Sequence, residues 1–222
     1  MNLASYLDNT NLKPEATHQE IAALCNEAAR LKMAAVCIHA CRLPLAAEIL
    51  AGSDVKLCTV IGFPLGADGR DSKVFAAAHA LQSGAGELDV VINLGALKDG
   101  NYQQVEEEVA QLLKLKKEYA FILKVIVETA LLTSVELIAL TRMLGDCGAD
   151  FIKTSTGFSS RGVSLQDLQI ITAHRSSGLK IKAAGGIREL DFALQLIEAG
   201  ADRLGSSSAG KILEEYKVRG GC

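Results

Sequence analysis

The chain has 222 residues, of which 49% are apolar and 22% charged, with a formal net charge of −3. This length and apolar content suit one sizeable core better than two. The slight acidic charge, without a basic block, argues against nucleic acid as a partner. The most apolar window, 119–132, is too short to span a bilayer. Because no basic segment leads into an apolar run at the start, we expect a soluble, cytoplasmic protein without membrane partners.

Short apolar runs alternate with longer amphipathic stretches along the chain. We expect strands at 5–10, 34–39, 56–62, 87–93, 121–128, 150–157, 179–186 and 202–206. The helices expected between and after them cover 17–31, 45–50, 72–82, 102–118, 133–147, 164–174, 190–198 and a terminal stretch ending near 218. Two of these helices begin with capping boxes, Thr17–Glu20 and Thr133–Glu136.

A faint internal repeat supports this count of elements. Segments 83–87, 147–150 and 199–202 each close a helix with glycine and lead into a strand. Eight such units predict a single (β/α)8 TIM barrel over residues 1–222. A doubly wound open sheet is the alternative, but its usual glycine-rich turn after the first strand is missing.

The sixth and seventh strands each carry an unusual lysine. Lys153 lies inside a short apolar run, and Lys182 follows 29 residues later, a spacing typical of one strand–helix–strand unit. On neighbouring parallel strands both amines can point into one cavity, where two ammonium groups cannot both stay charged cheaply. Lys153 is then either a barrel-end partner of a carboxylate or a neutral, nucleophilic amine. The second lysine favours the amine, and with it imine chemistry.

Other polar residues interrupt the apolar strands. Asp8, Asp89 and Lys124 belong to this group, and in barrels the reacting groups lie at the carboxyl ends of the strands. The apolar neighbours of Asp89 would raise its pKa unless a cation lies nearby. Asp89 is therefore either one half of a salt bridge with Lys124 or Lys182, or a carboxylate that relays protons and orients an ammonium group.

Glycine and serine follow the seventh and eighth strands, at Gly185–Arg188 and Gly205–Ser208. Exposed amides, hydroxyls and a helix amino terminus after these two strands are the usual phosphate cradle of such barrels. Either stretch alone also serves a tight turn between strand and helix. Together they favour a phosphorylated substrate.

The sequence contains no recognisable metal-binding motif. None of the six cysteines forms a CxxC pair, and the four histidines are scattered singly. Most cysteines, such as Cys37 and Cys58, have apolar neighbours, and there a free thiol behaves as a small hydrophobe. We expect reduced thiols and no metal ion.

Six stretches in order along the chain resemble the class I, DeoC-type deoxyribose-phosphate aldolase family. They are LDNTNLKPEAT (7–17), TVIGFPLG (59–66), ELDVVIN (87–93), KVIVET (124–129), FIKTSTGF (151–158) and KAAGGIR (182–188). The resemblance implies a lyase that reversibly cleaves 2-deoxy-D-ribose 5-phosphate to acetaldehyde and D-glyceraldehyde 3-phosphate. It also implies no metal or organic cofactor, and a role in deoxyribonucleoside breakdown.

The resemblance also implies roles for particular residues. Lys153 matches the imine-forming lysine, Asp89 and Lys182 match the proton-relay pair, and Asp8, Lys124 and Thr156 match residues that line the site. The phosphate-binding positions are matched by Gly157, Gly185, Gly186, Gly205, Ser207 and Ser208.

The chain departs from the family pattern at a few positions. Asn9 stands where histidine is frequent, His39–Cys41 replaces a proline-containing turn, and Arg161 lies in a less glycine-rich loop, where it either contacts phosphate or faces solvent. None of these changes affects the two lysines or Asp89. The alternatives are another Schiff-base barrel, an isomerase barrel acting on a sugar phosphate, and a barrel that has become a binding module. We also expect a homo-oligomer, a dimer or tetramer.

Overall fold

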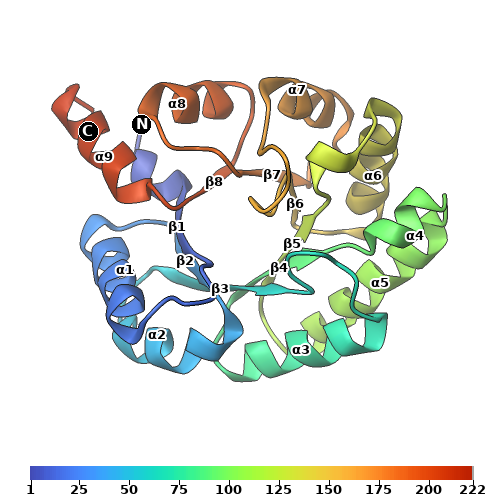
Figure 1. Ribbon diagram of the computed structural model, residues 1–222, viewed down its shortest axis with the longest axis horizontal. Coiled ribbons are helices and arrows are strands. Elements are labelled where there is room, and N and C mark those ends of the chain that lie inside the picture. Colours follow the sequence, from blue (N-terminus) through green and yellow to red (C-terminus); the bar gives the residue numbers. More distant parts are fainter. Residues whose placement is uncertain (222) are drawn as a thin grey trace.

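The computed structural model describes residues 1–221 and shows a closed barrel of parallel strands paired in sequence order, β1 to β8, with helices around it (Figure 1). The strands are β1 (Leu7–Asn11), β2 (Ala35–Ile38), β3 (Lys56–Ile61), β4 (Glu87–Val91), β5 (Ile122–Ile126), β6 (Phe151–Lys153), β7 (Lys180–Ala184) and β8 (Arg203–Ser206). The helices are α1 (His18–Leu31), α2 (Leu43–Ile49), α3 (Arg70–Gln82), α4 (Leu94–Lys98), α5 (Tyr102–Lys114), α6 (Ser134–Cys147), α7 (Leu165–His174), α8 (Leu190–Glu198) and α9 (Ala209–Val218). The predicted (β/α)8 barrel is confirmed.

The differences from the predicted elements are local. Residues Leu3–Tyr6 form a 3-10 turn, so the first strand begins at Leu7 rather than at residue 5. Helix α4 was not predicted; it is short, and the Asn93 side chain caps it by accepting a hydrogen bond from the Ala96 amide. The long helix predicted to reach residue 118 ends as α5 at Lys114 and continues as a 3-10 turn. Both predicted capping boxes are present.

Alternation along the strands separates the apolar core from the charged residues. In β4, Leu88 and Val90 belong to the apolar core between barrel and helices. Glu87 and Asp89, on the other side of the same strand, are fully buried inside the barrel. A parallel barrel covered by helices is buried on both faces, so polar inward residues must find partners among themselves.

The register of the strands places the inward-facing charged residues of neighbouring strands side by side. Asp89 is paired with Lys124 across β4 and β5, and Lys153 with Lys182 across β6 and β7. Lys182 is in turn paired with Arg203 on β8. The prediction that the two lysines lie on neighbouring parallel strands is therefore confirmed, but only Lys153 of the two lines the pocket at the end of the barrel.

Within residues 1–221, no helix combines the length and the apolar character needed to cross a membrane.

Candidate active site

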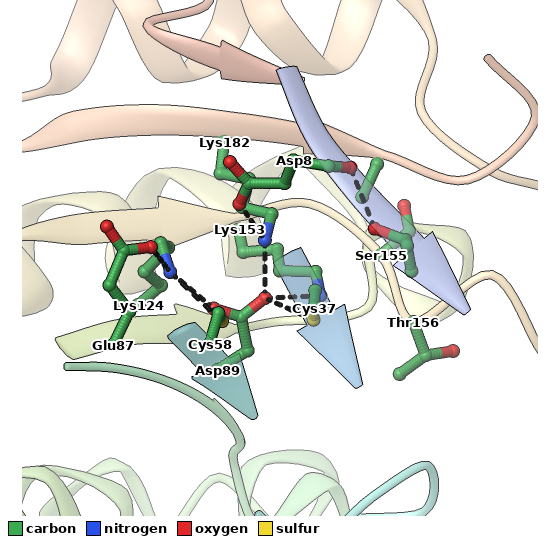
Figure 2. A network of polar contacts seen from close by, with 12 residues as sticks. Asp8, Cys37, Cys58, Glu87, Asp89, Lys124, Lys153, Ser155, Thr156 and Lys182 are labelled. Atoms are coloured by element: carbon green, nitrogen blue, oxygen red, sulfur yellow. Dashed lines mark hydrogen bonds and ion pairs between the residues drawn. The ribbon is translucent and has the colours of Figure 1, made fainter. Parts of the chain in front are cut away.

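Asp89 is the centre of the polar contacts inside the barrel (Figure 2). Its Oδ1 lies 2.8 Å from Lys124 Nζ, and its Oδ2 lies 2.7 Å from Lys153 Nζ and 2.6 Å from Lys182 Nζ. Burial opposes ionisation of this carboxyl, but the ammonium groups around it hold its pKa well below the usual range. Asp89 therefore forms both salt bridges considered from the sequence, with Lys124 and with Lys182, and it also contacts Lys153.

The contacts continue into a closed circuit. Lys182 Nζ lies 2.6 Å from Asp8 Oδ2, and Asp8 Oδ1 lies 2.6 Å from Arg203 Nη2. Arg203 Nη2 contacts Glu87 Oε2 at 3.1 Å, and Lys124 Nζ contacts the same Glu87 oxygen at 2.6 Å. We call these six residues the charged ring; they are Asp8, Glu87, Asp89, Lys124, Lys182 and Arg203. Carboxylates and cations alternate around the ring, so its charges cancel.

Lys153 is attached to the charged ring but is not part of it. Each cation of the ring contacts two carboxylates, whereas Lys153 contacts only Asp89 among the residues described. An ammonium group at Lys153 would therefore add one positive charge to a buried group of charges that is already balanced.

Lys182 holds its charge. Its burial favours the neutral amine, but Asp8 and Asp89 outweigh burial and raise its pKa well above the ordinary value. The sequence predicted that one of the two paired lysines would lose its proton readily. The two carboxylates beside Lys182 favour its charged form instead.

Ionisation of Asp8 makes the stability of the fold depend on pH in acid solution. Burial alone would raise the pKa of Asp8, but Lys182 and Arg203 outweigh it and lower the pKa to about 2. The pKa of Asp8 is near 4 in the unfolded chain and lower in the folded protein, so the ionised carboxylate stabilises the fold above about pH 4. This stabilisation is lost as the pH falls from about 4 through 2. A gap of roughly two units corresponds to about 2.5 kcal/mol.

We therefore expect Asp8→Asn to be less stable than the parent at pH 6 and to lose part of the parent's decline in stability between pH 4 and 2. Urea unfolding at several pH values measures this. Asp68→Asn, at an exposed carboxylate, is the control. Equal slopes for parent and Asp8→Asn would contradict the expectation.

A pocket of about 450 Å³ opens at the carboxyl ends of the strands, above the charged ring. Lys153 lines it, and no residue of the ring does. Of the predicted site residues, the pocket is lined by Lys153, Thr156, Gly157, Gly185, Gly186, Gly205 and Ser207. Asp8, Asp89, Lys124 and Lys182 lie beneath it, fully buried. Lys153 is thus the one charged group inside the barrel that a molecule in the pocket can reach directly.

The glycines of the pocket wall have conformations that other residues rarely adopt. Gly157, Gly185 and Gly186 have φ values of 88°, 84° and 78°. A Cβ added to Gly162 would lie 2.0 Å from the carbonyl oxygen of Gly185. The loops after β6 and β7 therefore pack backbone against backbone.

Serine residues after β8 complete this wall. Ser206 and Ser207 line the pocket, whereas Ser208 does not; Ser208 is the residue before α9 and donates its amide to Ser206 Oγ at 2.9 Å. Two basic side chains, Lys13 and Arg188, also line the pocket. Lys13 was not singled out from the sequence, because one lysine in an exposed loop carries no distinguishing signal.

Two further residues hold the loop after β6. The Thr156 amide and hydroxyl both donate to Glu128 Oε2, and Glu128 itself is buried. Arg161 donates to both Asp167 oxygens, at 2.6 and 3.1 Å, and to the Thr129 carbonyl at 3.0 Å. Arg161 therefore anchors the loop and does not line the pocket. Of the two roles expected for Arg161, the exposed side chain fits the solvent-facing one, although its guanidinium group also holds Asp167.

The other departures from the family pattern also have structural partners. Asn9 is buried on the outside of the barrel, where its amide donates to Glu27 Oε2 at 2.9 Å. His39 donates from Nε2 to the Leu12 carbonyl at 3.0 Å, and Leu12 lines the pocket. Asn9 thus points away from the site, and His39 supports its rim.

Cys37 and Cys58 pack in a small apolar cluster, as expected of free thiols, and they also contact the charged ring. Cys58 Sγ lies 3.1 Å from Asp89 Oδ1 and 3.3 Å from Lys124 Nζ, and Cys37 Sγ lies 3.9 Å from Asp89 Oδ2. These thiols and Asp89 are close enough to share a cation. Both oxygens of Asp89 already contact lysines, however, so a metal ion there would face the ammonium groups of Lys124 and Lys182. The donor set suits lysine better than a metal.

A closed (β/α)8 barrel with a lysine at the floor of a pocket on its carboxyl-terminal face defines a class, the TIM-barrel enzymes. The family model described as "DeoC/LacD family aldolase" matches residues 3–213. The chain belongs to this family and is an aldolase, a lyase.

Relatives and solved structures agree with this assignment. The chain is 46% identical over 216 residues to deoxyribose-phosphate aldolase of Thermococcus gammatolerans, with 96% of each chain covered. It is 43% identical over 217 residues to that of Clostridium tetani, covering 98% of this chain and all of the other. The structure of deoxyribose phosphate aldolase from Aeropyrum pernix, described as a unique tetramer, superposes with a TM-score of 0.90 at 36% identity, covering 97% of this chain and 91% of that one.

Proposed function

We propose that this chain is a deoxyribose-phosphate aldolase that reversibly cleaves 2-deoxy-D-ribose 5-phosphate to acetaldehyde and D-glyceraldehyde 3-phosphate through an imine on Lys153. The observation that carries the proposal is the position of Lys153. Among the lysines and carboxylates described inside the barrel, only Lys153 both lines the pocket and contacts a residue of the charged ring. The relatives reported above bear this enzyme's name over nearly their full length.

The proposed mechanism uses Lys153 as a neutral amine. The charged ring balances without it, and the charged Lys182 shares an Asp89 oxygen with it. The neutral amine adds to the aldehyde of the open-chain sugar, and loss of water leaves a protonated imine. The C2–C3 bond then breaks: the C3 hydroxyl loses its proton, glyceraldehyde 3-phosphate departs, and the electron pair of the bond forms an enamine. Protonation of the enamine and hydrolysis of the imine release acetaldehyde and restore the lysine.

Asp89 and Lys182 supply the proton transfers in this proposal. Asp89 Oδ2 lies 2.7 Å from Lys153 Nζ, so it can accept a proton as the carbinolamine forms. Lys182 contacts the same oxygen and stays protonated, so it can return a proton through that oxygen. Asp8 and Lys124 would hold this pair in place from beneath.

The phosphate would lie against the wall formed by the loops after β6, β7 and β8. The residues that line that side of the pocket include Arg188, Ser207 and the glycines Gly157, Gly185, Gly186 and Gly205, and backbone amides, a hydroxyl and a guanidinium group are the donors that a phosphate needs. The amino terminus of α9, at Ser208, adds a favourable dipole for an anion nearby.

Ser207→Asp tests both the reaction and the phosphate site. Ser207 is exposed, so the fold should tolerate the change, while the new carboxylate would repel a phosphate. We expect kcat/KM for deoxyribose 5-phosphate to fall about a hundredfold and that for unphosphorylated deoxyribose to change little. Ser207→Asn, of similar size and without charge, is the matched control.

Release of acetaldehyde from deoxyribose 5-phosphate is the primary measurement. Formation of a ketose phosphate instead would overturn the aldolase reaction and support the isomerase alternative. Equal losses with both substrates in Ser207→Asp would remove the phosphate from this part of the pocket.

We further propose that the chain acts as a homo-oligomer in the cytoplasm, in deoxyribonucleoside breakdown. The tetrameric Aeropyrum pernix relative supports an oligomer. Light scattering of the purified protein tests it, and a mass of one chain would contradict it.

A further inference from the structure

We infer that Glu87 and Arg203 are positioning residues that keep Lys153 neutral by balancing the charged ring. This inference rests on the proposed role of Lys153 and extends it to two residues that line no part of the substrate pocket. Neither residue was among the site residues predicted from the sequence.

Glu87 and Arg203 are neighbours in the charged ring, and their ring contacts are with Lys124 and Asp8 rather than with Asp89. Neither contacts Lys153, and Arg203 lines a separate cavity of about 290 Å³ with Ser5, Tyr6, Phe151, Lys180 and Asp202. Arg203 joins Asp8 to Glu87, and Glu87 joins Arg203 to Lys124. Without this pair, the remaining ring residues would be an open chain rather than a circuit.

The balance of charge gives this pair its effect on Lys153. With all six ring residues ionised, the ring is neutral and offers no net charge to stabilise an ammonium group at Lys153. Loss of Arg203 leaves a net negative ring, which would favour a protonated, unreactive Lys153. Loss of Glu87 leaves a net positive ring, which would favour the neutral amine down to lower pH.

Other titratable groups near Lys153 do not replace this pair. The groups that face Lys153 or the ring from the surrounding strands are Asp89, Lys182, Lys124, Asp8, Cys37 and Cys58. The pKa of Lys182 is raised well above its ordinary value, so this amine keeps its proton when the ring charge changes. Lys153, with its single carboxylate contact, is the site at which a change in ring charge should appear.

The test is the pH dependence of imine formation, measured by trapping acetaldehyde on Lys153 with borohydride and locating the adduct by peptide mass spectrometry. In Arg203→Gln we expect the acid limb of this profile to move up by about one pH unit. In Glu87→Gln we expect it to move down by a similar amount. At a fixed pH on that limb each shift is about a tenfold change in rate, in opposite directions. Glu87→Gln/Arg203→Gln should return the limb to its original position.

Arg203→Lys is the matched control, because it disturbs the two-carboxylate contact but keeps the charge. We expect it to reduce thermal stability and to leave the acid limb in place. If Arg203→Gln does not fold, the comparison between Glu87→Gln, Arg203→Lys and the double variant still decides the matter.

Two kinds of failure are distinguishable. Shifts in the same direction for Glu87→Gln and Arg203→Gln, or no shift in either, would overturn the balancing role while the parent still forms an adduct on Lys153. Absence of the adduct in the parent would instead overturn the proposed function.

Discussion

Lys153→Ala is expected to lower kcat/KM for cleavage of deoxyribose 5-phosphate by at least about 10⁴-fold. The physical reason is the loss of the amine that forms the imine, since no other lysine of the charged network lines the pocket. Folding should survive the substitution, because Asp89 keeps its contacts with Lys124 and Lys182. Cleavage kinetics and borohydride trapping with acetaldehyde measure the effect.

Lys180→Ala is the control for this experiment. Lys180 lies on the same strand as Lys182 but at its exposed end, so its loss should change neither kinetics nor trapping. An adduct on Lys182 in the Lys153→Ala variant, together with retained cleavage, would show that the roles of the two lysines are reversed.

Asp89→Asn is expected to damage both catalysis and stability. The carboxylate contacts the amines of three lysines in a fully buried position, and breaking a buried ion pair costs about 3–5 kcal/mol. Loss of the proton acceptor should lower kcat about 10²–10⁴-fold. Exchange of the methyl protons of acetaldehyde for deuterium, followed by NMR, isolates the step that forms the enamine. We expect this exchange to slow more than imine trapping.

A substitution at a second buried ion pair, away from the site, is the control that distinguishes an effect on catalysis from an effect on stability. Lys73 Nζ contacts Glu108 Oε2 at 2.9 Å outside the barrel, between α3 and α5. Glu108→Gln should therefore lower the free energy of unfolding without changing kcat. If Asp89→Asn kept its full exchange rate, Asp89 would have a structural role only.

Much of the fold follows from local patterns in the chain. Alternating apolar runs and capped helices predict the strand and helix order, because a βα unit is specified within some 30 residues of sequence. The errors fall where short-range signals compete, as at Leu3–Tyr6 and α4. In each, a single turn of helix replaces strand or loop through a few hydrogen bonds, which periodicity over a longer window does not resolve.

The candidate site was predicted in part. Lys153, Asp89 and Lys182 stand out because charged residues are rare inside apolar strands. Glu87 is fully buried in the barrel and Arg203 is partly buried, but both lie at the first residues of their strands, where a charged residue usually faces solvent. Cys58 gave no signal either, since an apolar sequence neighbourhood does not show which side of the strand a thiol occupies.

The sequence by itself determined the barrel, its family, and the identity of the paired lysines. Only the tertiary structure decided how the charges are distributed among them. Closure of the barrel brings β1 beside β8, so that Asp8 and Arg203, 195 residues apart, meet and complete the charged ring. Protonation depends on the sum of all charges in that buried space. The spacing of residues along the chain does not give this total charge, because the strands that contribute to it come into contact only when the barrel closes.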